Sequence, residues 1–291
     1  MNGFYNIIKP VGRSSSQLVV RLKKQLRSAT GGKMKIGHLG TLDPMASGVL
    51  GIAVGSATKL FDFFLAKRKV YVATCVLGTM TDTLDVAGTV IEEKPFTGVT
   101  DDEIIESLTK FEGVISQIPP IYSAKSVDGV RAYKLAAKGL SVELKPCQVT
   151  IYSIRYLRRE KENVFKMEIE CSGGTYIRSL CRDIGAALGY PAYMGSLERI
   201  QNGTMCIADA VSIEEIEKDI TAGFQSLESF GNSLKRIDFS EENEKGLKNG
   251  VKLFVDTADA YVSVYLSGKF YGIGRIEGNE LSMVAREYAI V

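Results

Sequence analysis

Apolar residues recur along the chain with two different spacings, and each spacing predicts its own kind of element. Runs rich in β-branched and aromatic residues at 3–8, 49–54 and 70–77 are typical of strands. Two further runs, 147–159 and 163–171, alternate between apolar and polar residues on either side of a polar turn. We therefore expect strands in all five segments.

Other stretches carry apolar residues three and four positions apart, which is the spacing of an amphipathic helix. The first such stretch follows Ser14 or Ser15, and the others lie at 57–65, 100–111 and 177–188. Either serine is a suitable N-cap for the first helix. In the second, Leu60, Phe61 and Phe64 are expected to face the core. A basic helix is also expected over 131–138.

The last part of the chain changes its pattern. Residues 212–245 are acidic and mostly helical in pattern, whereas alternating strand-like residues follow, with a hairpin turn at 267–269. We therefore expect two domains, 1–245 and 246–291. The second, at about 45 residues, is too small to be stable alone and is expected to dock on the first.

Composition is that of a globular protein without a membrane span. Apolar residues make up 45% of the chain and charged residues 24%, and no apolar run approaches the roughly 20 residues that cross a bilayer. The N-terminus lacks a basic and apolar signal segment. The five cysteines form no C-x-x-C pair, and with one histidine they cannot make an ordinary zinc site. We expect a cytoplasmic protein with reduced, mostly buried thiols and no metal.

Charge is distributed unevenly, although the net charge is only +2. The first 42 residues contain eight Lys and Arg and no Asp or Glu, whereas residues 212–245 carry nine acids and four bases. This imbalance is typical of a protein that binds nucleic acid with one face. An ordinary solvated surface is the alternative.

The only histidine, His38, and the first carboxylate, Asp43, lie in one Gly- and Pro-containing stretch, 37–50. The preceding bases place Asp43 in a positive field, which favours its ionised form. By itself, a lone Asp in such a loop is more typical of a turn.

Residues 37–50 closely resemble the G-H-T-G-T-L-D-P-x-A-x-G-x-L signature of the TruB family of pseudouridine synthases, with Leu39 in place of the family Thr. In that family the Asp is the nucleophile, which implies this catalytic role for Asp43. The family histidine helps to hold the place that the flipped base leaves, which implies a substrate-binding role for His38.

Two further family motifs follow in the same order. Residues 69–88 resemble K-x-Y-x-A with its T-D-T-x-D-x-x-G tail, which implies that Tyr71 stacks on the target uracil. Residues 174–180 match G-T-Y-I-R-[ST]-L, which implies that Tyr176 lies against the uracil and that Arg178 pairs with the Asp. Such a pair is expected to lower the pKa of Asp43 and to orient it.

Two more substrate-site residues come from the resemblance alone. Lys9 belongs to a segment similar to K-P-x-G-x-T-S and is expected to support the loop of Asp43. Leu197 matches a leucine that packs in the base pocket. Residues 117–125 resemble Q-x-P-P-x-Y-S-A-x-K, with Lys125 one place early, and are expected to contact the RNA backbone.

The resemblance implies an α+β fold: a catalytic domain with a mixed, mainly antiparallel sheet flanked by helices, and a small C-terminal PUA-like β-domain. It also implies a function, the isomerisation of a uridine in the T-loop of tRNA to pseudouridine by base flipping. The enzyme would bind the T-arm and act as a monomer, without a cofactor, a membrane or an obligatory protein partner. Asp43 would attack the ribose C1′ or the uracil ring, or act through a glycal, and Tyr71 is a candidate base for the C5 proton.

Three other interpretations stay open. One is a non-catalytic RNA-binding or RNA-folding protein, against which the intact Asp43, Tyr71 and Arg178 count. Another is a glycosidase-like hydrolase, but no motif offers an obvious second carboxylate. The third is the RNA-guided branch of the family, whose members usually carry extra basic tails that this chain lacks.

Overall fold

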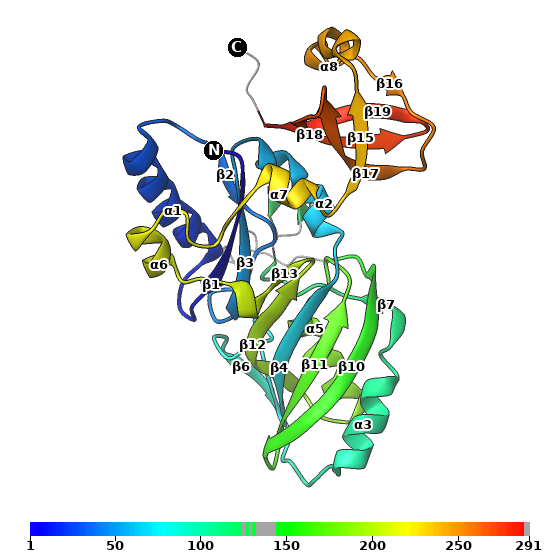
Figure 1. Cartoon of the computed structure of the whole chain (residues 1–291). Coiled ribbons are helices and arrows are strands. Elements are labelled where there is room, and N and C mark those ends of the chain that lie inside the picture. Colours follow the sequence, from blue (N-terminus) through cyan, green and yellow to red (C-terminus); the bar gives the residue numbers. More distant parts are fainter. Residues whose placement is uncertain (124–125, 128–129, 132–143, 288–291) are drawn as a thin grey trace.

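A long sheet forms the centre of the chain in a computed structural model, which describes residues 1–123, 126–127, 130–131 and 144–287 (Figure 1). Lys125, and all but Arg131 of the helix expected over 131–138, lie outside the described residues. The strands of this sheet are ordered β14-β1-β3-β12-β4-β11-β10-β7, with β2 and β13 added beside β3 and β12. All pairs of adjacent strands in this sheet are antiparallel except β12 and β3, which are parallel. The expected mixed, mainly antiparallel sheet is confirmed.

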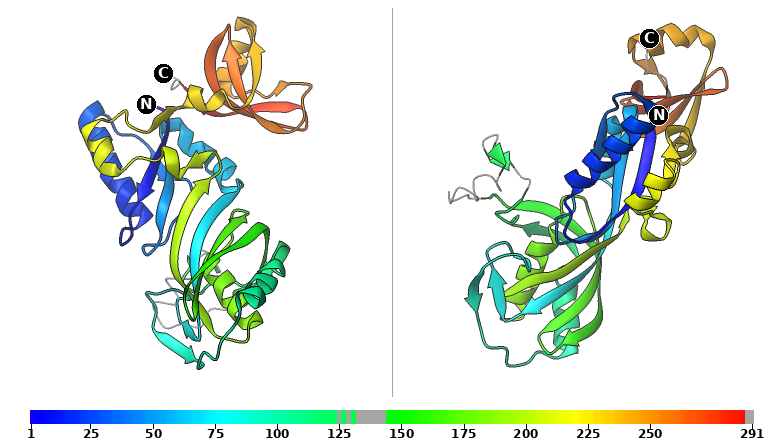
Figure 2. Two further views of the ribbon diagram at one scale, coloured as in Figure 1. Left: turned by 60° about the horizontal axis from the view of Figure 1, so that its bottom comes forward. Right: turned by 90° about the vertical axis from the view of Figure 1, so that its left-hand side faces the viewer.

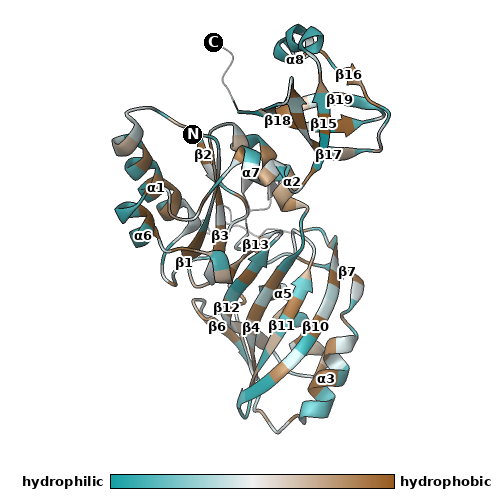
Figure 3. Cartoon of the chain, viewed as in Figure 1, coloured by the Kyte–Doolittle hydropathy of each residue, from teal (hydrophilic) through white to brown (hydrophobic). Residues whose placement is uncertain are grey.

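The five expected strands are present with small changes at their ends. The strands of the large sheet are β1 (Gly3–Lys9), β2 (Ile36–His38), β3 (Ser47–Val54), β4 (Lys69–Leu77), β7 (Gly113–Gln117), β10 (Cys147–Lys161), β11 (Val164–Cys171), β12 (Ala192–Asn202), β13 (Met205–Cys206) and β14 (Phe224–Ser226). Two short hairpins lie outside it: β5 (Thr79–Thr81) with β6 (Val90–Glu93), and β8 (Ser126–Val127) with β9 (Val130–Arg131). In Figure 3, β1 and β3 are mostly brown, as strands in a core must be.

The helices predicted after Ser14 or Ser15 and at 100–111 and 177–188 pack on this sheet by their apolar stripes. The helices of the N-terminal part are α1 (Ser15–Thr30), the 3₁₀ helix η1 (Gly55–Leu60), α2 (Phe61–Leu65), α3 (Asp101–Thr109), α5 (Ile177–Ala187), η2 (Ile207–Asp209), α6 (Ile213–Lys218) and α7 (Leu227–Gly231). Ser14 caps α1 in a capping box with Gln17. The views of Figure 2 place α1 beside α6, and Arg21 of α1 pairs there with Glu214 and Glu217.

One local expectation was wrong, and one strand was missed. The helix expected over 57–65 is split between η1 and α2, and Phe61 is 39% exposed instead of facing the core. A 3₁₀ turn advances about 120° per residue instead of 100°, so the inward stripe of a regular helix does not continue through it. The strand β12 was not expected at all, because Arg199 and Asn202 interrupt its apolar pattern, yet both are buried.

A second, five-stranded sheet forms the C-terminal part, in the order β15-β17-β18-β19-β16. Its elements are β15 (Lys235–Phe239), η3 (Glu241–Asn243), α8 (Glu244–Asn249), β16 (Leu253–Phe254), β17 (Ala260–Leu266), β18 (Lys269–Glu277) and β19 (Glu280–Arg286). The predicted hairpin at 267–269 is present between β17 and β18. Because β15 belongs to this sheet, we propose that the small domain begins near residue 235 and not at 246.

The two sheets share an apolar core, which confirms the expected docking of the small domain. Phe4, Phe64 and Phe230 from the first part pack in one cluster with Tyr265 and Phe270 of the small domain. Between the two parts, the ring centroids of Phe63 in α2 and Tyr261 in β17 lie 4.9 Å apart in an edge-to-face arrangement, which is favourable for aromatic pairs.

The cysteines and the helices can be compared with what the composition predicted. All five cysteines are free thiols; Cys75, Cys171 and Cys181 are buried, and Cys147 and Cys206 are half-buried. Within the described ranges, no helix is long and apolar enough to cross a membrane.

Gly48 stands where β3 meets β12, and we expect Gly48→Ala to destabilise the fold strongly. Its φ is +102°, and an added Cβ would collide with the carbonyl oxygen of Arg199 and lie 2.8 Å from its backbone nitrogen. Unfolding by denaturant should show a loss of about 3 kcal/mol. Gly12→Ala is the control, since Gly12 has φ +83° but no atom within 4 Å of an added Cβ; its loss should stay near 1 kcal/mol. Equal losses would refute the collision.

Candidate active site

A cavity of about 470 Å³ opens between the loop after β2, the strands β4 and β12, and the corner that starts α5. Five of the seven expected site residues line it: Asp43, Tyr71, Tyr176, Arg178 and Leu197. They come from four segments that are far apart in the sequence. Its size is typical of a small-molecule or single-base pocket.

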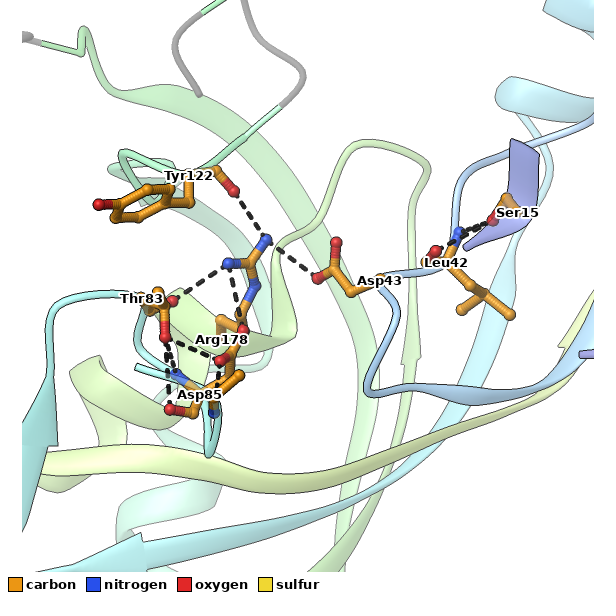
Figure 4. Close-up of polar contacts among 8 residues, drawn as sticks. Ser15, Leu42, Asp43, Thr83, Asp85, Tyr122 and Arg178 are labelled. Carbon is orange, nitrogen blue, oxygen red and sulfur yellow. Dashed lines mark hydrogen bonds and ion pairs between the residues drawn. The ribbon is translucent and has the colours of Figure 1, made fainter. Parts of the chain in front are cut away.

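Arg178 joins two carboxylates at one side of the cavity (Figure 4). Its Nη2 lies 2.9 Å from Oδ2 of Asp43, and its Nη1 lies 3.4 Å from Oδ2 of Asp85. The Arg178 side chain is 7% exposed, whereas that of Asp43 is 34% exposed because it faces the open cavity. The predicted pair of Asp43 with Arg178 is thus formed by the folded chain.

The guanidinium of Arg178 is also held by backbone oxygens. Nη1 donates to the carbonyl oxygen of Thr83 at 3.1 Å, and Nη2 donates to that of Tyr122 at 3.0 Å. Asp85 accepts hydrogen bonds from Thr83 Oγ1 at 2.7 Å and from the backbone N–H of Ala87 at 3.0 Å. These contacts leave the arginine little freedom to turn. Asp85 was missed as a site residue, although the T-D-T-x-D tail that contains it was the available signal.

The electrostatics of Asp43 differ from the expectation. Burial raises the pKa of its carboxyl above the ordinary 3.8, and the nearby Asp85 raises it further, whereas Arg178 and Lys9 lower it. The arginine therefore acts in the predicted direction, but the loss of solvent outweighs it. Arg178 and Lys9 thus favour the ionised form of Asp43, whereas burial and Asp85 oppose it.

Ser15 and Lys9 hold the loop that carries Asp43. Ser15 Oγ both donates to the carbonyl oxygen of Leu42 and accepts from its N–H, each at 2.9 Å (Figure 4). The ammonium of Lys9 is buried and donates to the carbonyl oxygens of Pro10, Arg13 and Pro44. Burial lowers the pKa of Lys9 to about 8. This placement supports the loop and keeps Lys9 outside the cavity wall.

His38 ends β2 and also lies outside the cavity lining. It is half-buried, and burial, followed by the charge of Arg199, lowers the pKa of its imidazole. Its Nδ1 is buried and has no hydrogen-bond partner among the described residues. The His38 imidazole therefore lies at the start of the loop that carries Asp43 and not in the lining of the pocket.

Apolar and aromatic side chains form another part of the cavity lining. Tyr71 of β4 and Leu197 of β12 are both nearly buried. Tyr176 stands at the N-terminal end of α5, where its backbone N–H donates to Gln117 Oε1 at 2.8 Å and its carbonyl accepts from Gln117 Nε2 at 3.1 Å. A flat, uncharged ring could therefore be enclosed between these side chains.

Two buried cations of the lining were also missed. Arg199 is 1% exposed; its Nε donates to the carbonyl oxygen of Val49 at 2.8 Å and its Nη2 to that of Gly40 at 3.0 Å. Lys69 is buried and donates to the carbonyl oxygens of Phe64, Leu65 and Lys67. Burial lowers the pKa of Lys69 to about 8. Arg199 belongs to β12, a strand that the sequence analysis did not predict.

Comparisons with known proteins agree along most of the chain. A family model described as TruB family pseudouridylate synthase (N terminal domain) matches residues 24–177. A second, described as tRNA pseudouridylate synthase B C-terminal domain, matches residues 178–235.

Curated relatives cover nearly the whole length. The tRNA pseudouridine synthase B of Clostridium perfringens (strain 13 / Type A) is 39% identical over 284 residues, which are 94% of this chain and 95% of that one. The protein of the same name from Lactobacillus johnsonii is 38% identical and covers 99% of this chain and all of its own. Among solved structures, a chain in a Cbf5-Nop10-Gar1 complex is 23% identical, with a TM-score of 0.71 over 98% of this chain and 84% of that one. The last match concerns the fold alone.

Proposed function

This chain belongs to the TruB family of pseudouridine synthases, and from that premise we propose that it isomerises one uridine in the T-loop of tRNA with Asp43 as the nucleophile. Relatives with about 39% identity over 94% of the chain are named for tRNA, so tRNA is its substrate class. The observation that carries the assignment of Asp43 is its ion pair with Arg178 at the mouth of an aromatic-walled cavity.

The reaction begins with extrusion of the target uridine from the folded loop. Flipping a base costs a few kcal/mol, and stacking in the pocket offsets that cost. Tyr71, Tyr176 and Leu197 would enclose the uracil, and His38, beside the loop of Asp43, would help to hold the place that the base leaves. Lys9, which binds the carbonyl oxygen of Pro44, would hold the loop that carries Asp43 in place.

Asp43 then starts the departure of the base. Its carboxylate attacks the ribose C1′ or the uracil ring, or it removes a proton so that the base departs by way of a glycal. The freed uracil turns and is rejoined through C5, and a base takes the C5 proton; Tyr71 is our candidate. The overall change is an isomerisation, which moves the glycosidic bond from N1 to C5 without a group donor.

The same proposal covers the working form of the enzyme. We expect a monomer that needs no cofactor or protein partner and acts in the cytoplasm. The first 42 residues, which are rich in Lys and Arg, would face the T-arm, since cationic side chains that contact the phosphate backbone release its counterions. The small β-domain, PUA-like in its expected fold, would extend this surface.

The experiment uses tRNA transcribed without modifications and the full chain alone. After incubation without added cofactor, pseudouridine is mapped by carbodiimide treatment and reverse-transcription stops. One new stop in the T-loop is the expected result. Tight tRNA binding with no new stop would refute the proposal and favour an RNA-folding or RNA-guided protein.

Tyr71→Phe tests whether the hydroxyl acts in the chemistry. The ring and its stacking remain, so tRNA affinity should persist, whereas the single-turnover rate should fall by about 10²-fold or more if the hydroxyl moves a proton. Tyr265→Phe is the matched control, because Tyr265 is similarly buried but belongs to the small domain. An unchanged rate in Tyr71→Phe would restrict Tyr71 to stacking.

A further inference from the structure

The cavity is electrically divided between its two sides. On one side, Arg178 is shared by two carboxylates, those of Asp43 and Asp85. On the other, Arg199 and Lys69 are cations that form no ion pair with any Asp or Glu among the described residues. Both line the cavity.

The strands β4 and β12 place these cations next to the aromatic wall. Arg199 is the direct partner of Tyr71 across the two strands, and Lys69 lies two residues before Tyr71 on the same face of β4. Asn202 stands opposite Lys69 in the same ladder. The positive side is therefore the side where Tyr71 and Leu197 would hold a base.

A buried guanidinium without a carboxylate needs an explanation, because removing a cation from water costs several kcal/mol. The carbonyl oxygens of Gly40 and Val49 satisfy hydrogen bonds of Arg199 but do not cancel its charge. In a pocket shielded from water, such a charge strongly stabilises any negative charge that appears within it. The arrangement is thus suited to a reaction in which the bound base becomes anionic.

The proposed isomerisation produces such a base. When the C1′–N1 bond breaks, its electron pair stays with the uracil, which becomes an anion with its charge on N1, O2 and O4. Either an Asp43 oxygen bonds to C1′ as N1 leaves, or Asp43 takes the C2′ proton and a C1′=C2′ double bond forms. Attack on the ring also places negative charge on O4. Later C5 bonds to C1′ as the bond from Asp43 to C1′ or to the ring breaks or, on the glycal route, as Asp43 returns the proton to C2′. The C5 proton then leaves to a base, and N1 gains a proton.

We propose that Arg199, assisted by Lys69, stabilises the negative charge that the uracil carries between cleavage and reattachment. This inference rests on the proposed function and assigns the two sides of the cavity different tasks. The Asp43 side acts on the sugar, and the Arg199 side holds the detached base. Arg199 stands opposite Tyr71 in the ladder of β4 and β12, and both line the cavity, so the cation is a neighbour of the candidate base for the C5 proton.

The test compares two leaving groups in the full-length enzyme. T-arm transcripts carry either uridine or 5-fluorouridine at the target, and consumption of the target nucleoside is followed in single turnovers. Fluorine withdraws electrons and stabilises the uracil anion by itself. Arg199→Gln should slow the uridine reaction by about 10²-fold or more and the 5-fluorouridine reaction by clearly less, whereas Arg199→Lys, which retains the charge, should slow both less. RNA affinity should be retained.

Asn202→Ala is the matched control for a purely structural effect. Asn202 lies on the same strand and also binds the loop of Asp43, since its Nδ2 donates to the carbonyl oxygen of Leu39 at 3.2 Å, but it has no charge. Asn202→Ala should slow the reactions of uridine and 5-fluorouridine by the same factor. An equal factor for Arg199→Gln would overturn the inference, because loop displacement would then explain the loss.

Two further outcomes are decisive. If Arg199→Gln does not fold, as judged by its circular dichroism melt, Lys69→Gln carries the same comparison, because Lys69 holds carbonyls of residues 64–67 and not of the Asp43 loop. Equal slowing by Lys69→Gln would then overturn the inference. A wild-type enzyme that leaves the target uridine unchanged would instead refute the proposed function, and this inference with it.

Discussion

Asp43→Asn is expected to abolish isomerisation while tRNA binding stays near that of the unchanged protein. The amide has nearly the same size and can still contact Arg178, but it cannot act as an anionic nucleophile or accept a proton. The loss should be at least about 10⁴-fold in single-turnover rate, as for other essential nucleophiles. Binding is measured separately by filter retention of the tRNA.

The control for this substitution is Asp62→Asn, which removes an exposed carboxylate of α2 outside the cavity lining. Its rate should be unchanged. Normal turnover by Asp43→Asn would remove Asp43 from the chemistry altogether. Loss of tRNA binding in parallel with the rate would indicate a structural role instead.

The pH dependence of the unchanged enzyme provides a second readout of Asp43. Only its ionised form is reactive, so the rate should fall as pH drops through the pKa of this carboxyl. Because burial raises that pKa above 3.8, the acid limb of the single-turnover profile should lie above pH 3.8. A limb at or below this value would show that the ion pair with Arg178 outweighs burial.

Arg178→Met is expected to cost both activity and stability. Without the guanidinium, Asp43 and Asp85 face each other as carboxylates with no cation between them. Breaking a buried ion pair by removing one partner typically costs about 3–5 kcal/mol. The rate should fall by at least about 10²-fold because Asp43 is then neither oriented nor kept ionised. Denaturant unfolding and single-turnover rates measure the two effects.

Arg178→Lys separates charge from geometry. Its ammonium keeps the positive charge but cannot reach two carboxylates and the carbonyls of Thr83 and Tyr122 as the planar guanidinium does. Stability should therefore be partly restored while the rate stays low. Arg182→Lys, one turn along α5, is the control, because within the described part of the chain Asp183 is the one acid that Arg182 pairs with. A Met variant as stable as the wild type would refute the predicted cost.

Local patterns predicted the local elements because their causes are local. The capping box at Ser14 and the hairpin at 267–269 depend on residues within a few positions of each other. The motif residues Asp43, Tyr71 and Arg178 were identified in the same way, since each stands in a contiguous signature. Their meeting in one cavity was expected from resemblance and is formed by the fold.

Other features depended on partners distant in sequence. Strand β12 was not predicted because Arg199 breaks its apolar alternation. The carbonyl oxygens of Gly40 and Val49, brought by other segments, accept hydrogen bonds from this buried arginine. Phe61 is exposed because η1 changes the helical phase before it.

The sequence by itself determined the identity of the reactive groups, the capped helices and the alternating strands, because propensity, capping and side-chain periodicity act over a few residues. Only the tertiary structure decided which charges lose their water and which partners they then have. It joined Asp85 to Arg178 and gave Arg199 no carboxylate partner among the residues that the structure describes. It also let burial outweigh the ion pair in setting the pKa of Asp43. Desolvation depends on everything that surrounds a group in space, and neighbours in sequence supply only a small part of that surrounding.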